Sequence, residues 1–97
     1  MDYNFEWEPV KAGSNRQKHK ISFELATTVF QDSLMVSVFD TEHGETGERW
    51  VTIGQAANGQ VIVVIHTFVE RDENNVTIRI ISAREATKHE QRQYETK

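Results

Sequence analysis

The sequence predicts an α+β domain: an antiparallel β-sheet meander, preceded by a strand and a pair of helices and followed by a C-terminal helix. Two observations carry this prediction. The spacing of apolar residues changes from a helical period to alternation after Asp32-Ser33. Asn58-Gly59 between two apolar runs predicts a hairpin with a type I′ turn, in which both residues take positive φ. The expected element order is β-α-α-β-β-β-β-α.

The N-terminal part of the chain predicts a short strand and two helices. Residues 5–7 alternate between apolar and polar, as in a half-buried strand. Pro9 fits the first turn of a helix that runs to His19. That helix is polar on all sides except at Ala12, so we expect tertiary contacts to support it. Ser22 is a suitable N-cap for a second helix, whose apolar stripe consists of Phe23, Ala26 and Phe30.

The rest of the chain predicts four strands and a final helix. The strands are expected at 35–39, 50–54, 61–69 and 76–82, with a polar loop at 41–47 and a turn at 72–75. The run 61–69 is apolar on both faces, which is typical of a central strand. Ser82 and Glu85 form a capping-box pattern, which predicts a helix from there to about Tyr94. Its inner face is polar, so either it packs loosely or another chain covers it; that face is Ala83, Thr87, Glu90 and Tyr94.

Length and composition bound the class of protein. The 97 residues suit a single domain spanning 1–97. The chain has no cysteine, which excludes disulfides and thiolate chemistry. The first residues do not resemble a signal peptide, and the longest apolar run, 61–65, is too short to cross a bilayer. We therefore expect a soluble, cytoplasmic protein with no membrane contact.

The charge distribution leaves two interpretations open. The net charge of −4 argues against a general nucleic-acid binder. However, basic residues gather within 11–20 and after residue 76, whereas 40–48 is acidic. These segments could produce a polarised surface, or they could belong to an ordinary mixed-charge exterior.

The sequence predicts no metal or cofactor site. The four histidines share no helical or strand spacing that would suit metal ligation. Gly44 and Gly47 lie in an acidic stretch that lacks the lysine of a phosphate-binding loop. No nucleophile-elbow pattern supports a catalytic serine.

The remaining polar residues suit phosphodiester cleavage without a metal. This chemistry needs a base for the 2′-hydroxyl, cations for the developing charge and an acid for the leaving oxygen. Arg79 alternates with isoleucines and is expected to point away from the face that they bury. Arg84 is expected in the first turn of the final helix, where a cation opposes the helix dipole. Both arginines could equally form surface ion pairs, for example with Glu48 or Glu90.

Two further side chains could transfer protons. His19, between Lys18 and Lys20, is the best candidate for acid or base catalysis, although a lone histidine near a helix end is as often a capping or packing residue. Tyr94 could act near a phosphate or stack on a base, or it could simply anchor the final helix. Trp7 and Trp50 are expected in the core rather than as platforms for bases.

Taken together, residues along nearly the whole chain resemble the BrnT toxin family. The opening signature is Phe5-Glu6-Trp7-Glu8, Lys11, Asn15, Lys18-His19, Ser22-Phe23-Glu24 and Ala26. Further matches are Val29-Phe30-Gln31-Asp32, Asp40, His43, Glu48-Arg49 and Ile53-Gly54. The closing stretch is Arg79-Ile80-Ile81-Ser82-Ala83-Arg84, Ala86-Thr87, Glu90 and Tyr94-Glu95. The family usually has glycine after the histidine, where this chain has Lys20.

The resemblance implies a RelE-like fold and a toxin of a type II toxin–antitoxin system. It implies metal-independent cleavage of RNA that inhibits translation, in the cytoplasm. It also implies neutralisation by a BrnA-like antitoxin with a ribbon-helix-helix part. The complex would repress its own operon, so that DNA is contacted only through the antitoxin.

The resemblance and the side-chain chemistry together suggest roles for eight residues. Arg79 and Arg84 would bind the scissile phosphate, with Arg49, Lys11 and Lys18 as further contacts to the RNA. His19 or Glu48 would accept a proton, and Tyr94 or His19 would donate one.

The alternative is a non-catalytic antitoxin-binding module, or an inactive homologue that acts as a co-repressor. Convergence of Arg79, Arg84 and His19 on one open face favours the nuclease. Their dispersal into separate ion pairs favours the binding module.

Overall fold

A computed structural model describes residues 2–40 and 49–96 of the chain. The predicted loop 41–47 and Glu48 lie outside the described residues. None of the described helices has the length and hydropathy that a membrane crossing requires. The described elements are β1 (Asp2–Glu6), α1 (Pro9–His19), α2 (Phe23–Thr27), the 3₁₀-helix η1 (Thr28–Gln31), β2 (Val36–Asp40), β3 (Arg49–Gln55), β4 (Val61–Thr67), β5 (Val69–Glu70), β6 (Asn75–Glu85) and α3 (Lys88–Glu95).

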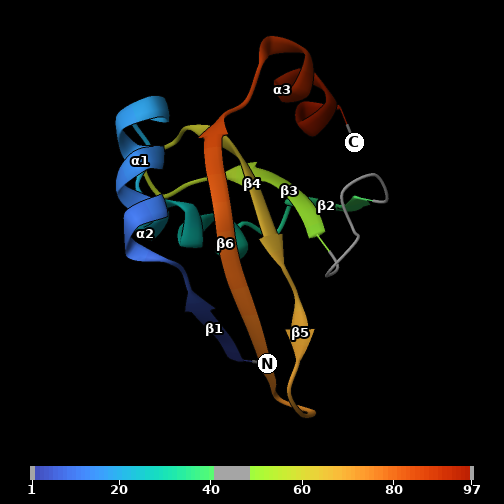
Figure 1. Cartoon of the computed structure of the whole chain (residues 1–97). Coiled ribbons are helices and arrows are strands. Elements are labelled where there is room, and N and C mark those ends of the chain that lie inside the picture. The colour runs from blue at the N-terminus through green and yellow to red at the C-terminus, as the bar shows by residue number, and fades with distance from the viewer. Residues whose placement is uncertain (1, 41–48, 97) are drawn as a thin grey trace.

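The described strands form one six-stranded sheet in the order β1-β6-β4-β3-β2, with β5 paired to β6 (Figure 1). The α+β class and the central position of β4 are confirmed. The expectation of an antiparallel sheet is wrong for β1, which runs parallel to β6. The predicted order also lacks β5. The expected strand 61–69 is divided at Phe68 into β4 and β5, and both of these strands pair with β6. Pairing with β3 extends only to Thr67, opposite Arg49.

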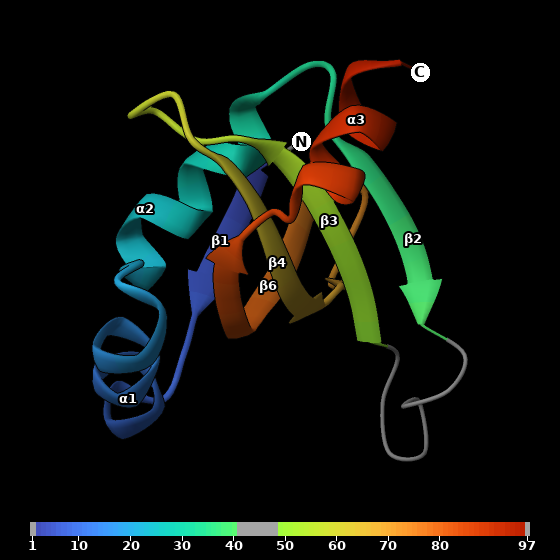
Figure 2. The same ribbon diagram turned by 90° about the horizontal axis from the view of Figure 1, so that it is seen from above.

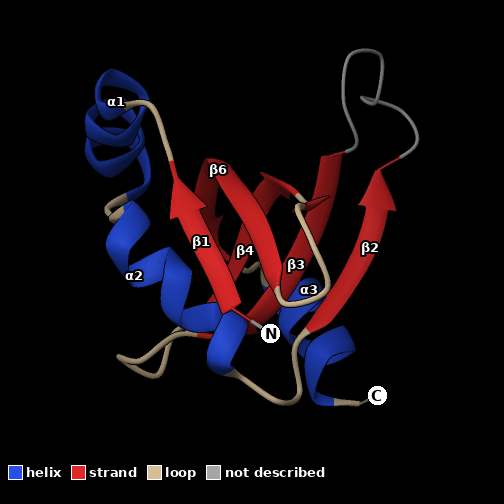
Figure 3. Cartoon of the chain, turned by 90° about the horizontal axis from the view of Figure 1, so that it is seen from below, coloured by secondary structure: helices blue, strands red, loops and turns tan. Residues whose placement is uncertain are grey.

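The hydrophobic core lies between one face of the sheet and the helices α1, α2 and η1. Figures 2 and 3 show α1 and α2 on one side of the sheet, with α3 apart from them beside β3 and β2. The stripe predicted for the second helix is buried, and it packs against the inward residues of β4 and β6. Gly54 permits the closest approach: a Cβ atom there would lie 2.7 Å from a methyl group of Val29.

Helix α1 has the predicted bounds, and its contacts explain how a polar sequence remains helical. The Glu8 carboxylate caps the N-terminus by accepting from the Lys11 backbone N–H at 2.7 Å, and Pro9 occupies the first turn. At the other end Lys20 has a φ of 63°, the left-handed conformation that glycine favours after a helix. A glycine at this position would take that conformation without strain.

Asn15 supplies the tertiary contact that α1 requires. Its side chain is buried, with Nδ2 donating to the carbonyls of Ala83 (2.9 Å) and Ile21 (3.1 Å). Its Oδ1 accepts from the Ala83 N–H at 3.1 Å. Strand β1 pairs with β6 only as far as Arg79, so the edge of β6 beyond it lacks a neighbouring strand. The amide of Asn15 takes the place of that strand at Ala83.

Two predictions of local structure are wrong. The final helix starts at Lys88, with Thr87 and Glu90 as its capping box, and not at Ser82. Pairing of β6 with β4, up to Glu85 opposite Ile62, holds the earlier capping pattern in an extended strand. The β3–β4 hairpin is not of type I′, because only Gly59 has a positive φ.

The actual hairpin turn depends on Asn58 and Gly59 in a different way. The Ala56 carbonyl accepts from the Gly59 N–H at 2.9 Å, which closes a turn of four residues. The Asn58 side chain accepts from the Gln60 N–H at 3.0 Å, so asparagine stabilises the turn through its side chain rather than by a positive φ.

Candidate functional site

A β-bulge in β6 brings Arg79 and Arg84 to the same face of the sheet. Ile80 is opposite His66 and Ser82 is opposite Ile65, so β6 contains one extra residue, Ile81, at this point. Residues five positions apart in a regular strand point to opposite faces. The extra residue reverses the alternation, and Arg84 therefore faces away from the core as Arg79 does.

We call the side of the sheet that faces away from α1 and α2 the open face. Strand register places its residues in three rows across the sheet. They are Arg84, Val63, Ile53 and Val36 in the first row, Ser82, Ile65, Val51 and Val38 in the second, and Arg79, Thr67, Arg49 and Asp40 in the third. The centre is aliphatic and partly exposed, with Val38 59% accessible. An aliphatic patch bounded by three arginines is suited to a large polyanionic or amphipathic partner rather than to a small enclosed ligand.

The two arginines of β6 extend from backbone positions that are well separated along the sheet. Arg79 lies beside Thr67 of β4, and Arg84 lies opposite Val63 of β4. Val63 and Thr67 are four residues apart, so the backbones of the two arginines are separated by about 13 Å along the sheet. Arginine side chains extending from these positions could contact different phosphates of one strand. The arrangement of the two arginines is therefore suited to an extended nucleic-acid strand that runs along β6.

Arg79 is held loosely. It lies opposite Glu6 of β1 in the parallel pair, with 3.9 Å between its Nη1 and the Glu6 carboxylate. Both side chains are about half exposed, and an exposed pair of this length contributes little to stability. Arg79 is thus available to exchange Glu6 for a phosphate.

Arg84 is held firmly, and through it α3 is attached to the sheet. Its two terminal nitrogens donate to the two carboxylate oxygens of Glu90, at 2.7 and 2.8 Å. The hydrogen bonds from Arg84 lower the pKa of Glu90 to about 2. Val63, which faces the same way as Arg84, is 1% exposed, as expected if α3 covers this end of the open face.

Tyr94 makes the second attachment of α3. Its hydroxyl donates to Oδ2 of Asp32, and this hydrogen bond raises the pKa of Tyr94 to about 12. The same carboxylate accepts from the backbone N–H groups of Leu34 and Gln55. No residue of α3 is buried, so these two polar attachments, Arg84–Glu90 and Tyr94–Asp32, hold a helix that contributes nothing to the core.

The remaining sequence-predicted residues divide between the two sides of the sheet. Arg49 lies on the open face, two strands from Arg79, which corresponds to about 10 Å. His19, Lys18 and Lys11 belong to α1, which packs on the opposite side. Of the three residues whose convergence favours the nuclease, the structure brings Arg79 and Arg84 to one face, in separate ion pairs, and leaves His19 on the other.

Glu6 is a site residue that was not assigned a role from the sequence. It is exposed on the open face beside Arg79, and it offers a carboxylate next to a cation. The alternation of residues 5–7 predicts that Glu6 points to the face of its strand away from the apolar residues Phe5 and Trp7. Its proximity to Arg79 depends on the pairing of β1 with β6, which no local pattern reveals.

The two tryptophans have different surroundings. Trp7 packs edge-to-face on Phe23 against the core, as predicted. Trp50 is half-buried, contacts the rings of Phe39 and Phe68, and lines a cavity. Within 2–40 and 49–96, no three histidine, aspartate or glutamate side chains come together as a possible metal site.

Comparison with known proteins identifies one family. Residues 7–90 match the model of a family described as the ribonuclease toxin BrnT of type II toxin–antitoxin systems. This segment includes the bulge and all three arginines of the open face. No curated protein is similar enough in sequence to count as a relative.

Proposed function

Because the chain belongs to the BrnT family of ribonuclease toxins of type II toxin–antitoxin systems, we propose that it cleaves single-stranded RNA on the open face, without a metal ion, and so inhibits translation in the cytoplasm. The observation that carries this proposal is the bulge at Ile81, which aligns Arg79 and Arg84 on one accessible face. Bulges are frequent beside active sites because they redirect a side chain. A RelE-like arrangement of the catalytic surface belongs to the same proposal.

The open face supplies the groups that metal-free cleavage requires. The 2′-oxygen of a ribose attacks the adjacent phosphorus, its proton passes to a carboxylate, and the bond to the 5′-oxygen breaks as that oxygen gains a proton. Arg79 and Arg84 contact the phosphates, and Arg49 adds a third cation. Glu6, which lies beside Arg79 and is about half exposed, is proposed as the proton acceptor, with Glu48 as the alternative outside the described residues.

Tyr94 is the proposed proton donor to the leaving oxygen. A tyrosine hydroxyl is protonated at neutral pH, with or without the hydrogen bond to Asp32 that raises the pKa of Tyr94. Access to RNA requires Arg84 to exchange Glu90 for phosphate, and the same displacement of α3 would release Tyr94 from Asp32. His19, Lys18 and Lys11 lie on the other side of the sheet, and the proposed mechanism does not use them.

The same surface is the proposed docking site of the antitoxin. A BrnA-like protein that covers the aliphatic centre, with Val38 at its rim, would block the arginines at the same time. Neutralisation would then result from the antitoxin blocking the access of RNA to the arginines. DNA would be contacted by the ribbon-helix-helix part of the antitoxin and not by this chain.

One observation favours the second candidate function, a non-catalytic antitoxin-binding module. Arg84 and Arg79 each have a carboxylate partner already, and His19 belongs to α1, which packs on the other side of the sheet. A protein that only binds its partner and supports repression would need the aliphatic patch and no free cation. In that case RNA would remain intact at any protein concentration.

A cleavage assay separates the two functions. Purified full-length protein is incubated with single-stranded RNA in excess EDTA, and the products are resolved by length and end chemistry. We expect cleavage with cyclic phosphate ends, reduced about 10²-fold in Arg79→Ala and Arg84→Ala. Arg16→Ala, an exposed arginine on α1, is the matched control and should leave the rate unchanged. Intact RNA with wild-type protein that still binds its antitoxin would establish the binding module instead.

A further inference from the structure

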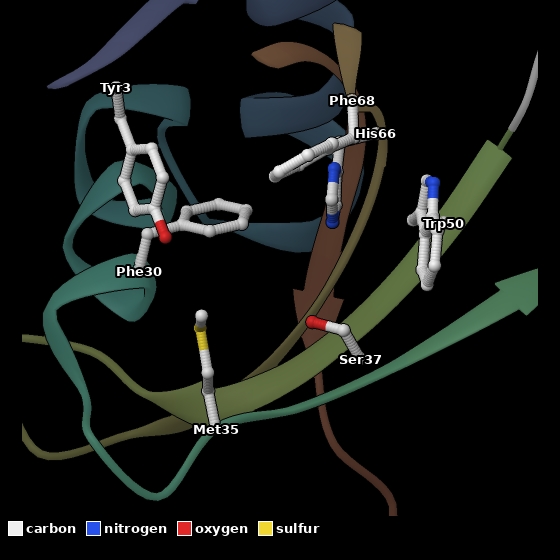
Figure 4. A pocket seen from close by; sticks show the side chains of 7 residues that line it. All are labelled: Tyr3, Phe30, Met35, Ser37, Trp50, His66 and Phe68. Atoms are coloured by element: carbon white, nitrogen blue, oxygen red, sulfur yellow. The ribbon is translucent and has the colours of Figure 1, made fainter. Parts of the chain in front are cut away.

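On the core side of the sheet, away from the open face, the structure has an aromatic cavity with no role in the proposed cleavage. Its volume is about 230 Å³, and its lining is Tyr3, Phe30, Met35, Ser37, Trp50, His66 and Phe68. Figure 4 shows Tyr3 and Phe30 on the side facing Trp50, with Phe68 and His66 between them and Met35 below. The walls are therefore flat rings on several sides.

The size and shape of the cavity limit what it can hold. Pockets for drug-sized ligands usually measure about 300–1,000 Å³, so this cavity suits one small ring system rather than a nucleotide. Aromatic walls stack well on planar rings, and Trp50 presents its ring beside Phe68 at the centroid distance of 6.3 Å. A planar, uncharged ligand fits both properties.

A chain of three hydrogen-bonded side chains, Ser37, Thr52 and His66, fixes the hydrogen-bonding role of Ser37 in the cavity. His66, which is 2% exposed, places Nδ1 2.8 Å from the Thr67 carbonyl, and a carbonyl can only accept. Nδ1 therefore carries the hydrogen. Burial lowers the pKa of His66, so the ring is neutral and its Nε2 is an acceptor.

The tautomer of His66 sets the direction of the other two hydrogen bonds. Thr52 lies 2.7 Å from Nε2 and must donate to it. The single hydroxyl proton of Thr52 is then used, so the Ser37 hydroxyl, also at 2.7 Å, must donate to Thr52. Ser37 is left with its oxygen lone pairs at the cavity. Ser37 therefore offers an acceptor to a ligand in the cavity.

From this arrangement we infer that the cavity binds a nucleobase with an exocyclic amino group, stacked against Trp50 and donating to Ser37 Oγ. A free nucleoside and an unpaired position of an RNA strand both present this ring and amino group. This site lies on a different face from the arginines and does not depend on the ribonuclease proposal.

The test compares adenosine with purine riboside, which has the same ring system without the amino group. Binding to the full-length protein is followed by calorimetry and by amide and indole chemical shifts in NMR. We expect adenosine to shift the signals of Trp50, Ser37 and Phe68 and to leave Trp7 unchanged. Loss of one neutral hydrogen bond should make purine riboside bind roughly two- to tenfold more weakly.

Ser37→Ala supplies the complementary change in the protein. Ser37 lies in the edge strand β2 and is exposed, so the substitution should not disturb folding. The substitution should lower the affinity for adenosine to that of purine riboside and leave the affinity for purine riboside unchanged. Ser14→Ala, an exposed serine on α1, is the matched control and should preserve the preference for adenosine.

A competition arm identifies the source of the base. Displacement of adenosine by a short oligoadenylate would show that a strand can insert a base, whereas failure to displace it would restrict the site to free nucleosides. The inference is overturned if neither nucleoside shifts Trp50 at millimolar concentration, or if Ser37→Ala leaves the ratio of the two affinities unchanged. The ligand pair tests the site even without a variant.

Discussion

Replacing Asn15 with alanine removes the side chain that completes the edge of β6 at Ala83. The substitution deletes three hydrogen bonds of 2.9 to 3.1 Å, to the Ala83 N–H, the Ala83 carbonyl and the Ile21 carbonyl. Asn15 is 7% exposed and Ala83 is fully buried, so water cannot readily replace the lost partners. The N–H and carbonyl of Ala83 and the carbonyl of Ile21 are left unsatisfied.

The magnitude follows from the number of bonds. At about 1 kcal/mol of net stabilisation per hydrogen bond, Asn15→Ala should lower the free energy of unfolding by about 3 kcal/mol. A domain of this size has a total of about 5–15 kcal/mol, so the change is a large fraction of it. The melting temperature should fall by roughly 12–24 °C, since 1 kcal/mol corresponds to about 4–8 °C in a small domain.

Urea unfolding followed by circular dichroism measures this change. The midpoint should fall with little change in the slope m, because the folded state keeps its compactness. Ser14→Ala, on the exposed side of the same helix, should stay within about 0.5 kcal/mol of wild type. Asn15→Asp should destabilise at least as much as alanine, because it retains the acceptor but turns an oxygen toward two carbonyls. A loss below about 1 kcal/mol in Asn15→Ala would refute the role given to this amide.

Two further predictions concern α1 and α3. Lys20→Gly should stabilise the protein by about 0.5–1 kcal/mol, because a residue with a side chain is strained at a φ of 63°. Lys18→Gly, within the helix, should destabilise the protein by about 1 kcal/mol. If thermal unfolding shows that both substitutions change stability in the same direction, this explanation is contradicted. Glu90→Gln should destabilise by about 1 kcal/mol at pH 7, since the partly exposed pair with Arg84 is screened by solvent. The pKa of Glu90 is lowered to about 2, so its contribution is complete above its unfolded pKa of 4.5 and is lost as pH falls toward 2. The unfolding free energies of wild type and Glu90→Gln should therefore converge as the pH falls from 4.5 toward 2. The control Glu95→Gln should follow wild type throughout. If wild type and Glu90→Gln differ by the same free energy down to pH 2.5, the Arg84–Glu90 pair is excluded as the cause.

Local signals predicted the elements, and long-range pairing determined what those signals could not show. Pro9, Ser22 and the alternation in 50–54 correctly indicated a helix start, an N-cap and a strand, because each depends on neighbours in sequence. The capping-box pattern at Ser82 failed because pairing with β4 extends β6 past it. The parallel position of β1 likewise depends on contacts between residues more than 70 positions apart.

The same distinction applies to the candidate site. Alternation correctly predicted that Arg79 points away from Ile78 and Ile80, both of which are buried. Arg84 was expected on a helix, and only the register of β6 against β4 reveals the bulge that returns it to the face of Arg79. The Arg84–Glu90 pair, one of the sequence-based alternatives, is confirmed. His19 was grouped with the arginines by chemical type, which carries no information about the side of the sheet on which α1 packs.

The central claim, that the open face of the sheet is the toxic ribonuclease surface, is tested most directly by induced expression in a bacterial host. Growth and total RNA integrity are followed for wild type, Arg79→Ala, Arg84→Ala and the control Arg16→Ala at matched protein levels. The proposal predicts growth arrest with loss of RNA for wild type and Arg16→Ala, relieved by either open-face substitution. Normal growth with abundant folded wild-type protein and intact RNA would contradict it, as would arrest that persists unchanged in both Arg79→Ala and Arg84→Ala.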